Sequence, residues 1–405
     1  MPKLKGIQYL RAKLNNKRTR INTRYTYYEM KYIVQDFGIS TPPDLRAWMS
    51  CLGWCGKAVD SLADRLMFTG FKDDLFDLTG IFDMNNPDIL ADSAMLDALI
   101  CSCSFIYISP DEDGFPRLQV ISGANATGEI DPITYMLNEG YAVLERNTSG
   151  GPVLEAYFTP GRTQYIDRRT GRTWSIDNPA PYCLLVPIIY RPDAKRPFGH
   201  SRISRSCMSI VGSAVRTVKR SEIAAEFFSF PQKYVTGLSE SAEIKDKWMA
   251  AMSALMALTK DEDGDAPTVG QFSQQSMTPH LEQLRMFASL FAGEADLTLD
   301  DLGFASGNPA SADAIKSAHE ALRLRAKKAQ RIFGAGFLNA GFLAACLRDN
   351  YTYKRQVLYQ TKPTWEPVFE PDAAMLSGIG DALIKIEQSH PGYVTDDKLK
   401  ELTGF

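Results

Sequence analysis

The hydrophobic pattern of this chain changes its period at Gly199, and this change constrains the fold more than any other feature of the sequence. Between Phe105 and Tyr190, short runs alternate apolar and polar residues and are separated by glycine-containing turns. After Gly199, apolar residues recur every three or four positions as far as Phe228. The first pattern is typical of antiparallel strands and the second of an amphipathic helix. The order of the two predicts an α+β fold.

The predicted elements follow one another in a definite order. The strand runs include PRLQVI, YAVLER, EAYFT, TQYID and CLLVPIIY. The helix after them spans about 28 residues, or some 40 Å at 1.5 Å per residue. A strand (FPQKYVTGL), a helix over residues 239–258 and a strand (TVGQF) then form a small insert. Such an insert cannot bury a core of its own, so we expect its strands to pair between subunits of an assembly.

The remainder of the chain is mainly helical. A helix is predicted over residues 279–293, and a long polar loop, 294–311, interrupts both hydrophobic periods. One continuous helix is expected from about Ala312 to Leu347, with glycines at 334, 336 and 341 that favour close packing. The strand-like run TWEPVFEP and a helix over residues 373–388 end the pattern.

The amino terminus is basic. Residues 3–31 contain nine Lys or Arg side chains and one acidic side chain, interleaved with tyrosines. We expect residues 1–29 to form a surface arm. Two interpretations of its charge remain open, a solvated helix face and a contact with nucleic acid or a partner protein.

Overall charge and cysteine content exclude several classes of protein. With 45 Lys and Arg against 48 Asp and Glu, the net charge is -3, so any contact with nucleic acid should be weak or local. The seven cysteines are scattered along the sequence. This favours buried free thiols in a reducing compartment, both over a disulfide framework and over a zinc site at Cys51 and Cys55. The longest weakly charged stretch, 333–347, is too short and glycine-rich to span a membrane.

Three candidate catalytic arrangements do not meet the requirements of their chemistry. The loop GFASGNPASADAIK lacks the Gly-Lys-Ser/Thr ending of a phosphate-binding loop. Gly199, His200 and Ser201 are adjacent in sequence and are better explained as a turn glycine and a helix N-cap serine. Asp300 and Asp301 lack a third acid at a diagnostic spacing for a metal. We therefore expect no enzyme, no cofactor and no metal.

The order of elements, together with three segments, resembles the portal proteins of tailed bacteriophages. The segments are RPFGHSRISRS, AAEFFSFPQKYVTGL and LTLDDLGFASGNPASADAIKSAHEAL. The resemblance covers nearly the whole chain. It implies a wing, a stem, a clip, a tunnel loop and a short helical crown. The corresponding residues are 30–198 and 312–363 (wing and its returning helix), 199–228 and 276–293 (stem), 229–275 (clip), 294–311 (tunnel loop) and 364–405 (crown).

The resemblance also implies a function. Members of this family form a ring of twelve subunits at one capsid vertex, through which double-stranded DNA is packaged and ejected. The implied partners are other copies of the chain, the DNA, the terminase large subunit, the head-tail adaptor, and the major capsid and scaffolding proteins. Assembly would occur in the host cytoplasm and the location would be the virion, without a membrane. The alternative is another oligomeric connector or minor capsid protein of the virion.

Site residues follow from the same resemblance. The candidate channel residues of the tunnel loop are Asp296, Asp300, Asp301, Phe304 and Asn308. The candidate DNA contacts of the stem are Arg216, Lys219 and Arg220, for which a solvated or intersubunit helix face remains an open alternative. The candidate docking residues of the clip are Glu240, Glu243, Lys245 and Lys247. Weak contacts and acidic loop residues would suit a channel that must not grip its DNA.

Overall fold

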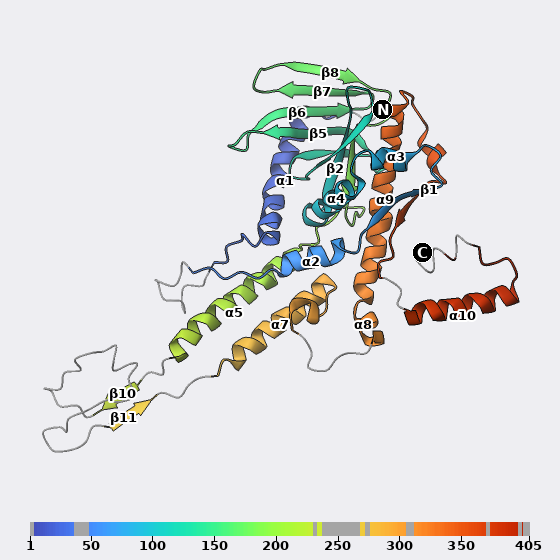
Figure 1. The fold of residues 1–405 in the computed structure, drawn as a ribbon. Coiled ribbons are helices and arrows are strands. Elements are labelled where there is room, and N and C mark those ends of the chain that lie inside the picture. The colour runs from blue at the N-terminus through green and yellow to red at the C-terminus, as the bar shows by residue number, and fades with distance from the viewer. Residues whose placement is uncertain are drawn as a thin grey trace. The chain divides into compact units, whose positions relative to one another are not determined.

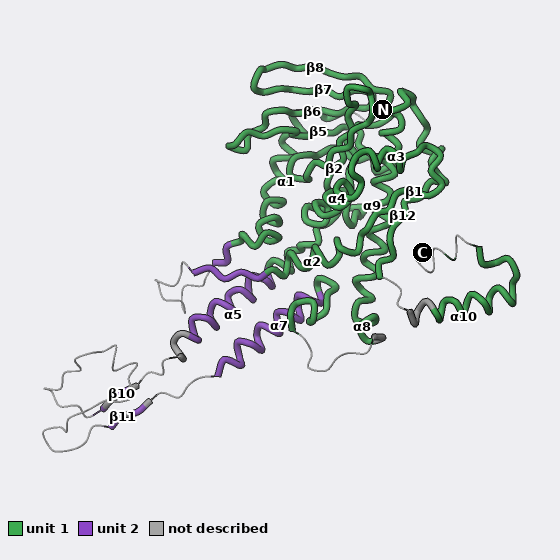
Figure 2. The backbone as a smooth tube through the Cα atoms, in the orientation of Figure 1, with its two compact units in different colours: residues 1–32, 53–208, 294–405 green, residues 33–52, 209–293 purple. Residues whose placement is uncertain are grey.

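A computed structural model gives the fold of the chain (Figure 1). It describes residues 4–35, 48–229, 233–236, 268–271, 276–304, 312–369, 373–395 and 399. The chain forms two compact units (Figure 2). Unit 1 contains residues 1–32, 53–208 and 294–405, and unit 2 contains residues 33–52 and 209–293. The predicted mixture of helices and antiparallel sheet is confirmed.

Among the described residues of unit 1, antiparallel strands form three sheets. The largest has the order β4-β5-β6-β7-β8, with strands Ala126–Ile130, Leu137–Arg146, Pro152–Thr159, Arg162–Asp167 and Thr173–Asp177. A second has the order β3-β2-β9, with strands Pro116–Ile121, Cys103–Pro110 and Leu185–Ile189. The third joins β1 (Phe68–Lys72) to β12 (Lys362–Trp365). Each strand run predicted between Phe105 and Tyr190 therefore overlaps an observed strand.

The helices of unit 1 lie before and after the strand-rich part of the sequence. They are α1 (Ile7–Tyr28), α2 (Trp54–Ala63), α3 (Leu78–Asp83), α4 (Pro87–Cys101), α8 (Ala312–Ala318), α9 (Glu320–Arg348) and α10 (Ala373–Ser389). The described part of the unit also contains two short 3-10 helices, η2 (Asp300–Leu302) and η3 (Arg355–Leu358). The helix predicted over residues 373–388 is confirmed by α10.

Two long helices connect the units. The first, α5 (Arg205–Ser229), begins in unit 1, and the second, α7 (Thr278–Ala295), ends there. Both confirm predicted helices. In unit 2, β10 (Lys233–Thr236) and β11 (Thr268–Gln271) confirm the two strands of the insert and pair with each other antiparallel. The helix predicted over residues 239–258 lies outside the described residues.

The prediction of one continuous helix from residue 312 to 347 is wrong. The helix is interrupted at His319, which separates α8 from α9 with φ -92° and ψ 4°. The His319 ring lies 6.3 Å from the ring of Phe369, and its Nδ1 lies 3.9 Å from Asp301 Oδ2. The apolar spacing continues across the break, so the sequence pattern does not reveal it.

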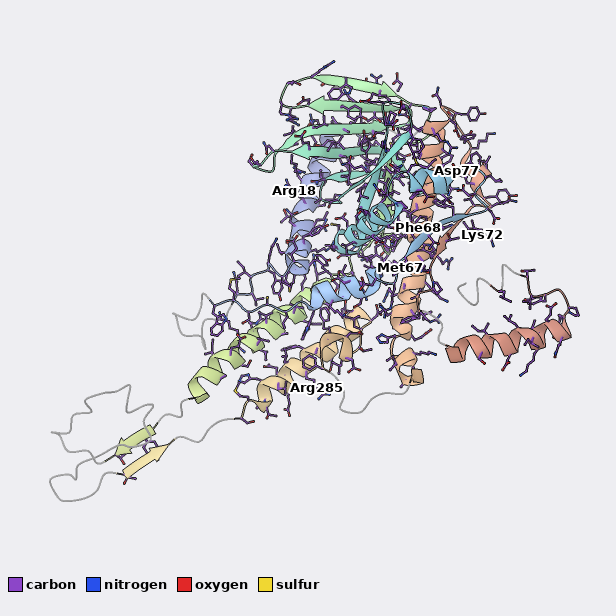
Figure 3. The ribbon with its side chains drawn as sticks, in the orientation of Figure 1. Arg18, Met67, Phe68, Lys72, Asp77 and Arg285 are labelled. Carbon is purple, nitrogen blue, oxygen red and sulfur yellow. The ribbon has the colours of Figure 1, made fainter. Side chains whose placement is uncertain are left out.

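Close packing around α9 confirms the role expected of its glycines. A Cβ at Gly334 would lie 2.4 Å from Pro363 Cγ, and one at Gly336 would lie 2.8 Å from Ile188 Cδ1. On the same helix, the Phe337 ring lies 4.9 Å from that of Phe68 on β1, a residue labelled in Figure 3. The missing side chains therefore let β9 and β12 approach the helix backbone.

The prediction that residues 1–29 form a surface arm is wrong. Helix α1 buries Leu10, Leu14 and Ile21, and the first two pack with Tyr141 and Val143 of β5. Its amino-terminal cations meet carboxylates of the large sheet. These contacts include Arg11 to Glu155, Lys13 to Glu129 and Lys5 to Glu129, at 2.5, 2.5 and 2.9 Å. Seen alone, the basic composition suggests an exposed segment, but acidic partners about 110–145 residues away in sequence neutralise several of its charges.

An ion-pair cluster joins the two places where the chain crosses between the units. Asp296, directly after α7, receives a two-pronged contact from Arg325 of α9, with N–O distances of 2.9 and 3.0 Å. Arg202, shortly before α5, donates to the same carboxylate at 3.0 Å and to the Ala58 carbonyl at 2.9 Å, and it also donates to the Ala295 carbonyl. Only 3% of the Arg202 side chain is exposed, so its charge depends on this carboxylate.

The cluster determines the protonation state of Asp296. Burial by itself would raise the pKa of this carboxyl, but the hydrogen bonds and charges of Arg325 and Arg202 outweigh it and hold the pKa below its usual range. A carboxyl whose pKa is depressed on folding stabilises the fold at pH values above its unfolded-state pKa. That contribution is lost as the pH falls through the folded-state value.

Asp296→Asn should lower the free energy of unfolding by about 3 kcal/mol at pH 7, because it leaves the buried Arg202 without its counter-charge. The difference from the wild type should shrink below about pH 4, where the unfolded-state carboxyl is protonated. Urea unfolding followed by tryptophan fluorescence measures both effects.

Asp177→Asn is the matched control, since this carboxylate is 85% exposed and lies 3.8 Å from an exposed arginine. Its effect should stay within about 0.5 kcal/mol. Equal stability of the two variants would contradict a structural role for the cluster.

Candidate functional site

The loop after α7 contains the candidate channel residues, and the structure assigns its first acid to another task. Asp296 has a left-handed backbone, φ 53°, and both of its carboxylate oxygens accept hydrogen bonds from arginines of unit 1. Its negative charge is thus neutralised within the unit. Asp296 therefore has no uncompensated charge to present to a channel.

Asp301 closes a short turn in the same loop. Its carboxylate accepts hydrogen bonds from the backbone nitrogen and the hydroxyl of Thr298, at 2.8 and 2.9 Å. Together with Asp300 it begins η2, which ends at Gly303 with φ 86°. This arrangement gives the loop a fixed start. Phe304 is half-buried, and Asn308 lies outside the described residues.

A metal site at these aspartates finds no support in the geometry. Within the described ranges, no group of three or more His, Cys, Asp or Glu side chains is arranged to hold a metal ion. The Asp301 carboxylate instead accepts hydrogen bonds from Thr298, and its Oδ2 lies 3.9 Å from Nδ1 of His319. The two aspartates are best explained as turn residues.

The three candidate stem cations lie on α5 but differ in exposure. Arg216 and Arg220 are half-buried, and Arg216 donates to the hydroxyl of Ser213 at 3.0 Å. Lys219 is only 9% exposed. A solvated helix face therefore does not describe Lys219, whose burial also limits its access to a passing ligand. The four candidate docking residues, Glu240, Glu243, Lys245 and Lys247, lie outside the described residues.

The structure separates the side chains considered for nucleophilic catalysis. Ser201 is 7% exposed and donates to the Ile100 carbonyl at 2.6 Å, whereas His200 Nε2 lies 2.5 Å from Asp193 Oδ2. The expected turn glycine is confirmed at Gly199, with φ 73°. The expected N-cap serine is wrong in position, because the hydroxyl that accepts the Cys207 N–H belongs to Ser204.

The cysteines follow the expectation of free thiols with one exception. All seven are unpaired and six are buried, while Cys51 is exposed. Burial raises the pKa of the Cys55 thiol, so it is neutral near pH 7 and a poor metal ligand. In the described part of the chain, no helix is both long and apolar enough to cross a bilayer.

Sequence reasoning missed the two arginines that hold Asp296. Arg202 lies in the segment RPFGHSRISRS and Arg325 in the first turns of α9, more than 120 residues later. Arg325 shares its helix face with Lys328, so its charge does not stand out in the sequence. Without the fold, nothing in the sequence connects it to Asp296.

Relatives of known identity support a single family. The family model described as "Phage portal protein, SPP1 Gp6-like" matches residues 7–373. The portal protein of Mycobacterium phage D29 is 25% identical over 416 residues, covering 96% of this chain and 83% of the relative. The portal protein of Mycobacterium phage L5 is 23% identical over 402 residues, covering 94% and 81%.

Solved structures of low sequence identity also resemble the chain. One comes from the virion of a native gene transfer agent (GTA) particle, with 13% identity, a TM-score of 0.47, and 95% and 99% of the two chains covered. Another comes from the neck of a native GTA particle computed with C12 symmetry, with 13% identity, a TM-score of 0.48, and 87% and 89% covered. The family match rests on the sequence and extends over more than nine-tenths of the chain. The chain belongs to the SPP1 Gp6-like family of phage portal proteins.

Proposed function

We propose that this chain assembles into a ring of twelve subunits at one vertex of a phage capsid and conducts double-stranded DNA during packaging and ejection. The observation that carries the proposal is the family match over residues 7–373. It makes a different class of virion connector the weaker alternative, because the match spans both units and the insert between α5 and α7. We infer no catalytic activity and no cofactor for the chain.

The proposed parts of the portal correspond to elements of the fold. Unit 1 supplies the wing, with α9 at its centre, and α10 supplies the short crown. Helices α5 and α7 supply the stem, and the β10–β11 insert supplies the clip. The tunnel loop would follow α7, with its start held by Asp296 and Asp301. We propose Asp300, Asp301, Phe304 and Asn308 as its channel-facing residues.

Charge supports a channel that holds DNA loosely. At -3 per subunit, a ring of twelve would carry about -36, and the acids of the tunnel loop would repel the phosphate backbone. Each firm phosphate contact would be repeated in every subunit and would slow the DNA. Arg216 and Arg220 remain candidates for transient contacts from the stem, with the buried Lys219 a weaker one.

Partners are proposed from the family and from the position of the insert. The clip, with Glu240, Glu243, Lys245 and Lys247, would dock the terminase large subunit during packaging and the head-tail adaptor afterwards. The wing would meet the major capsid and scaffolding proteins. Assembly would take place in the host cytoplasm, and the final location would be the virion.

Purified protein should form closed rings with an axial hole wide enough for a DNA duplex when imaged by negative stain. Native mass measurement should give about twelve times the 45.1 kDa chain. A chain that remains single under every assembly condition, and is absent from rings in the virion, would sink the proposal. Nucleotide hydrolysis or metal-dependent DNA cleavage by a clean preparation would indicate an enzyme instead.

The insert offers a second test of assembly. A two-stranded ribbon is marginally stable alone, so amides of Lys233–Thr236 should exchange rapidly in the monomer and become protected in the ring. Hydrogen exchange measures this, with residues 141–143 of β5 as the control that stays protected in both states. Equal, strong protection of β10 in monomer and ring would contradict pairing between subunits.

A further inference from the structure

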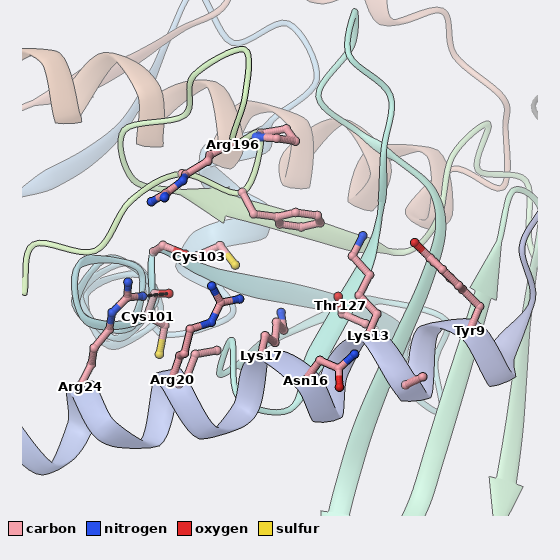
Figure 4. Close-up of a pocket in the computed structure, with 16 residues that line it drawn as sticks. Tyr9, Lys13, Asn16, Lys17, Arg20, Arg24, Cys101, Cys103, Thr127 and Arg196 are labelled. Atoms are coloured by element: carbon pink, nitrogen blue, oxygen red, sulfur yellow. Dashed lines mark hydrogen bonds between the residues drawn. The ribbon is translucent and has the colours of Figure 1, made fainter. Parts of the chain in front are cut away.

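A cavity of about 500 Å³ opens in unit 1 beside α1 (Figure 4). Its walls also include the end of α4, the start of β2 and the turn at residues 196–199. The cationic side chains that line it are Lys13, Lys17, Arg20, Arg24 and Arg196. The first four follow one another at spacings of four, three and four, so they lie on one face of α1. Figure 4 shows Arg196 on the opposite wall.

The positive charge of this cavity is only partly neutralised. Among the described residues that line it, none carries a carboxylate. Lys13 pairs with Glu129 from outside the lining, at 2.5 Å. Lys17 donates to the Ala126 carbonyl at 2.6 Å, and Arg24 donates to the Cys101 carbonyl at 3.2 Å. A carbonyl oxygen satisfies a hydrogen bond but leaves the charge of the donor in place.

Groups near the cavity supply less negative charge than its five cations carry. Burial raises the pKa of the Cys101 and Cys103 thiols, so both are neutral near pH 7. The carboxylate of Asp97, which adjoins Cys101 but does not line the cavity, accepts hydrogen bonds from Tyr25 and Ser122 and from the backbone N–H of Gly123, and its charge offsets part of that of Lys17. The five cations of the lining therefore exceed the two nearby carboxylates, Glu129 and Asp97, and the cavity keeps a surplus of positive charge.

Burial, and for Arg24 also the neighbouring cations, disfavour the charged forms of two of these side chains. Burial lowers the pKa of Lys17, and burial together with the neighbouring Arg20 and Arg196 lowers the pKa of Arg24. An anion in the cavity would relieve both effects. Aromatic contacts also hold the ammonium groups at the site, since Lys13 and Lys17 lie 5.0 and 5.7 Å from the centre of the Phe198 ring.

We propose that this pocket binds a small phosphate compound that carries at least two negative charges and is no larger than a nucleotide. Three guanidinium groups offer paired donors that match phosphate oxygens. A single carboxylate would leave most of the charge of Lys17, Arg20, Arg24 and Arg196 uncompensated. The volume lies in the range of small-molecule sites, about 300–1,000 Å³, and is too small for a base-paired duplex.

Calorimetric titration of the full chain with pyrophosphate, at physiological salt, tests the proposal. We expect saturable binding with one site per chain. Arg20→Gln should weaken it at least about tenfold, because a hydrogen bond between charged groups is lost. Arg20 is exposed, so its replacement should leave the fold intact. Arg196→Gln provides an independent second variant from the opposite wall and should have a similar effect.

Arg18→Gln is the matched control, because it removes the same charge from the same helix outside the cavity lining. Its affinity for pyrophosphate should stay within about twofold of the wild type. Inorganic phosphate and magnesium-free ATP, titrated in the same way, determine how large a phosphate compound the site accepts.

Three results would overturn the proposal. They are equal losses of affinity in Arg18→Gln and Arg20→Gln, the absence of saturable pyrophosphate binding at millimolar concentration, and preferential binding of a short DNA duplex or a glutamate-rich peptide that depends on Arg20. The first would indicate diffuse charge attraction, and the last would identify a macromolecular ligand.

Discussion

The carboxylate of Asp296 holds together three segments of unit 1 that are far apart in sequence. The chain leaves unit 1 in α5 and returns to it in α7. Arg202 lies just before α5, Asp296 lies directly after α7, and the two side chains are hydrogen-bonded. Arg325 adds α9, the helix at the centre of the aromatic packing, to the same cluster. A buried charge pair tolerates little displacement, since separation would leave a guanidinium uncompensated in a poorly hydrated place. The start of the proposed tunnel loop is thereby tied to the core of unit 1.

Charge is used in two different ways along α1. Toward its amino end, cations meet Glu129 and Glu155 and help hold the helix against the large sheet. Further along, the cations gather around a cavity with no carboxylate among its described lining residues. The same basic composition therefore serves as structural attachment at one end of the helix and leaves a surplus of positive charge at the other. The net charge of the whole chain, -3, reveals neither arrangement.

This distribution suits a protein proposed to conduct DNA. Several cations of unit 1 are paired internally, so they are withdrawn from contact with a phosphate backbone. Where positive charge remains concentrated, it lines a cavity too small for a duplex, and a small phosphate compound could occupy it without holding the genome. The elements proposed to face DNA carry acids or partly buried cations, which limits their grip.

The sequence was sufficient to predict the alternating strands, the helices α5, α7 and α10, the two strands of the insert and the close packing at the glycines of α9. These features depend on local spacing and on residue size. The family was also accessible from the order of the segments. The pairing of the two insert strands with each other was not predicted. Three features were not predictable from local sequence. They are the packing of α1 against the large sheet, the helix break at His319 and the pairing of the Asp296 carboxylate with two arginines. In each case the side chains contact residues far away in sequence. The cations of α1 contact carboxylates of the sheet, His319 lies near Phe369 and Asp301, and Asp296 accepts hydrogen bonds from two arginines. Only the tertiary structure brings such partners together, because a charge in the sequence does not reveal which opposite charge will lie within hydrogen-bonding distance.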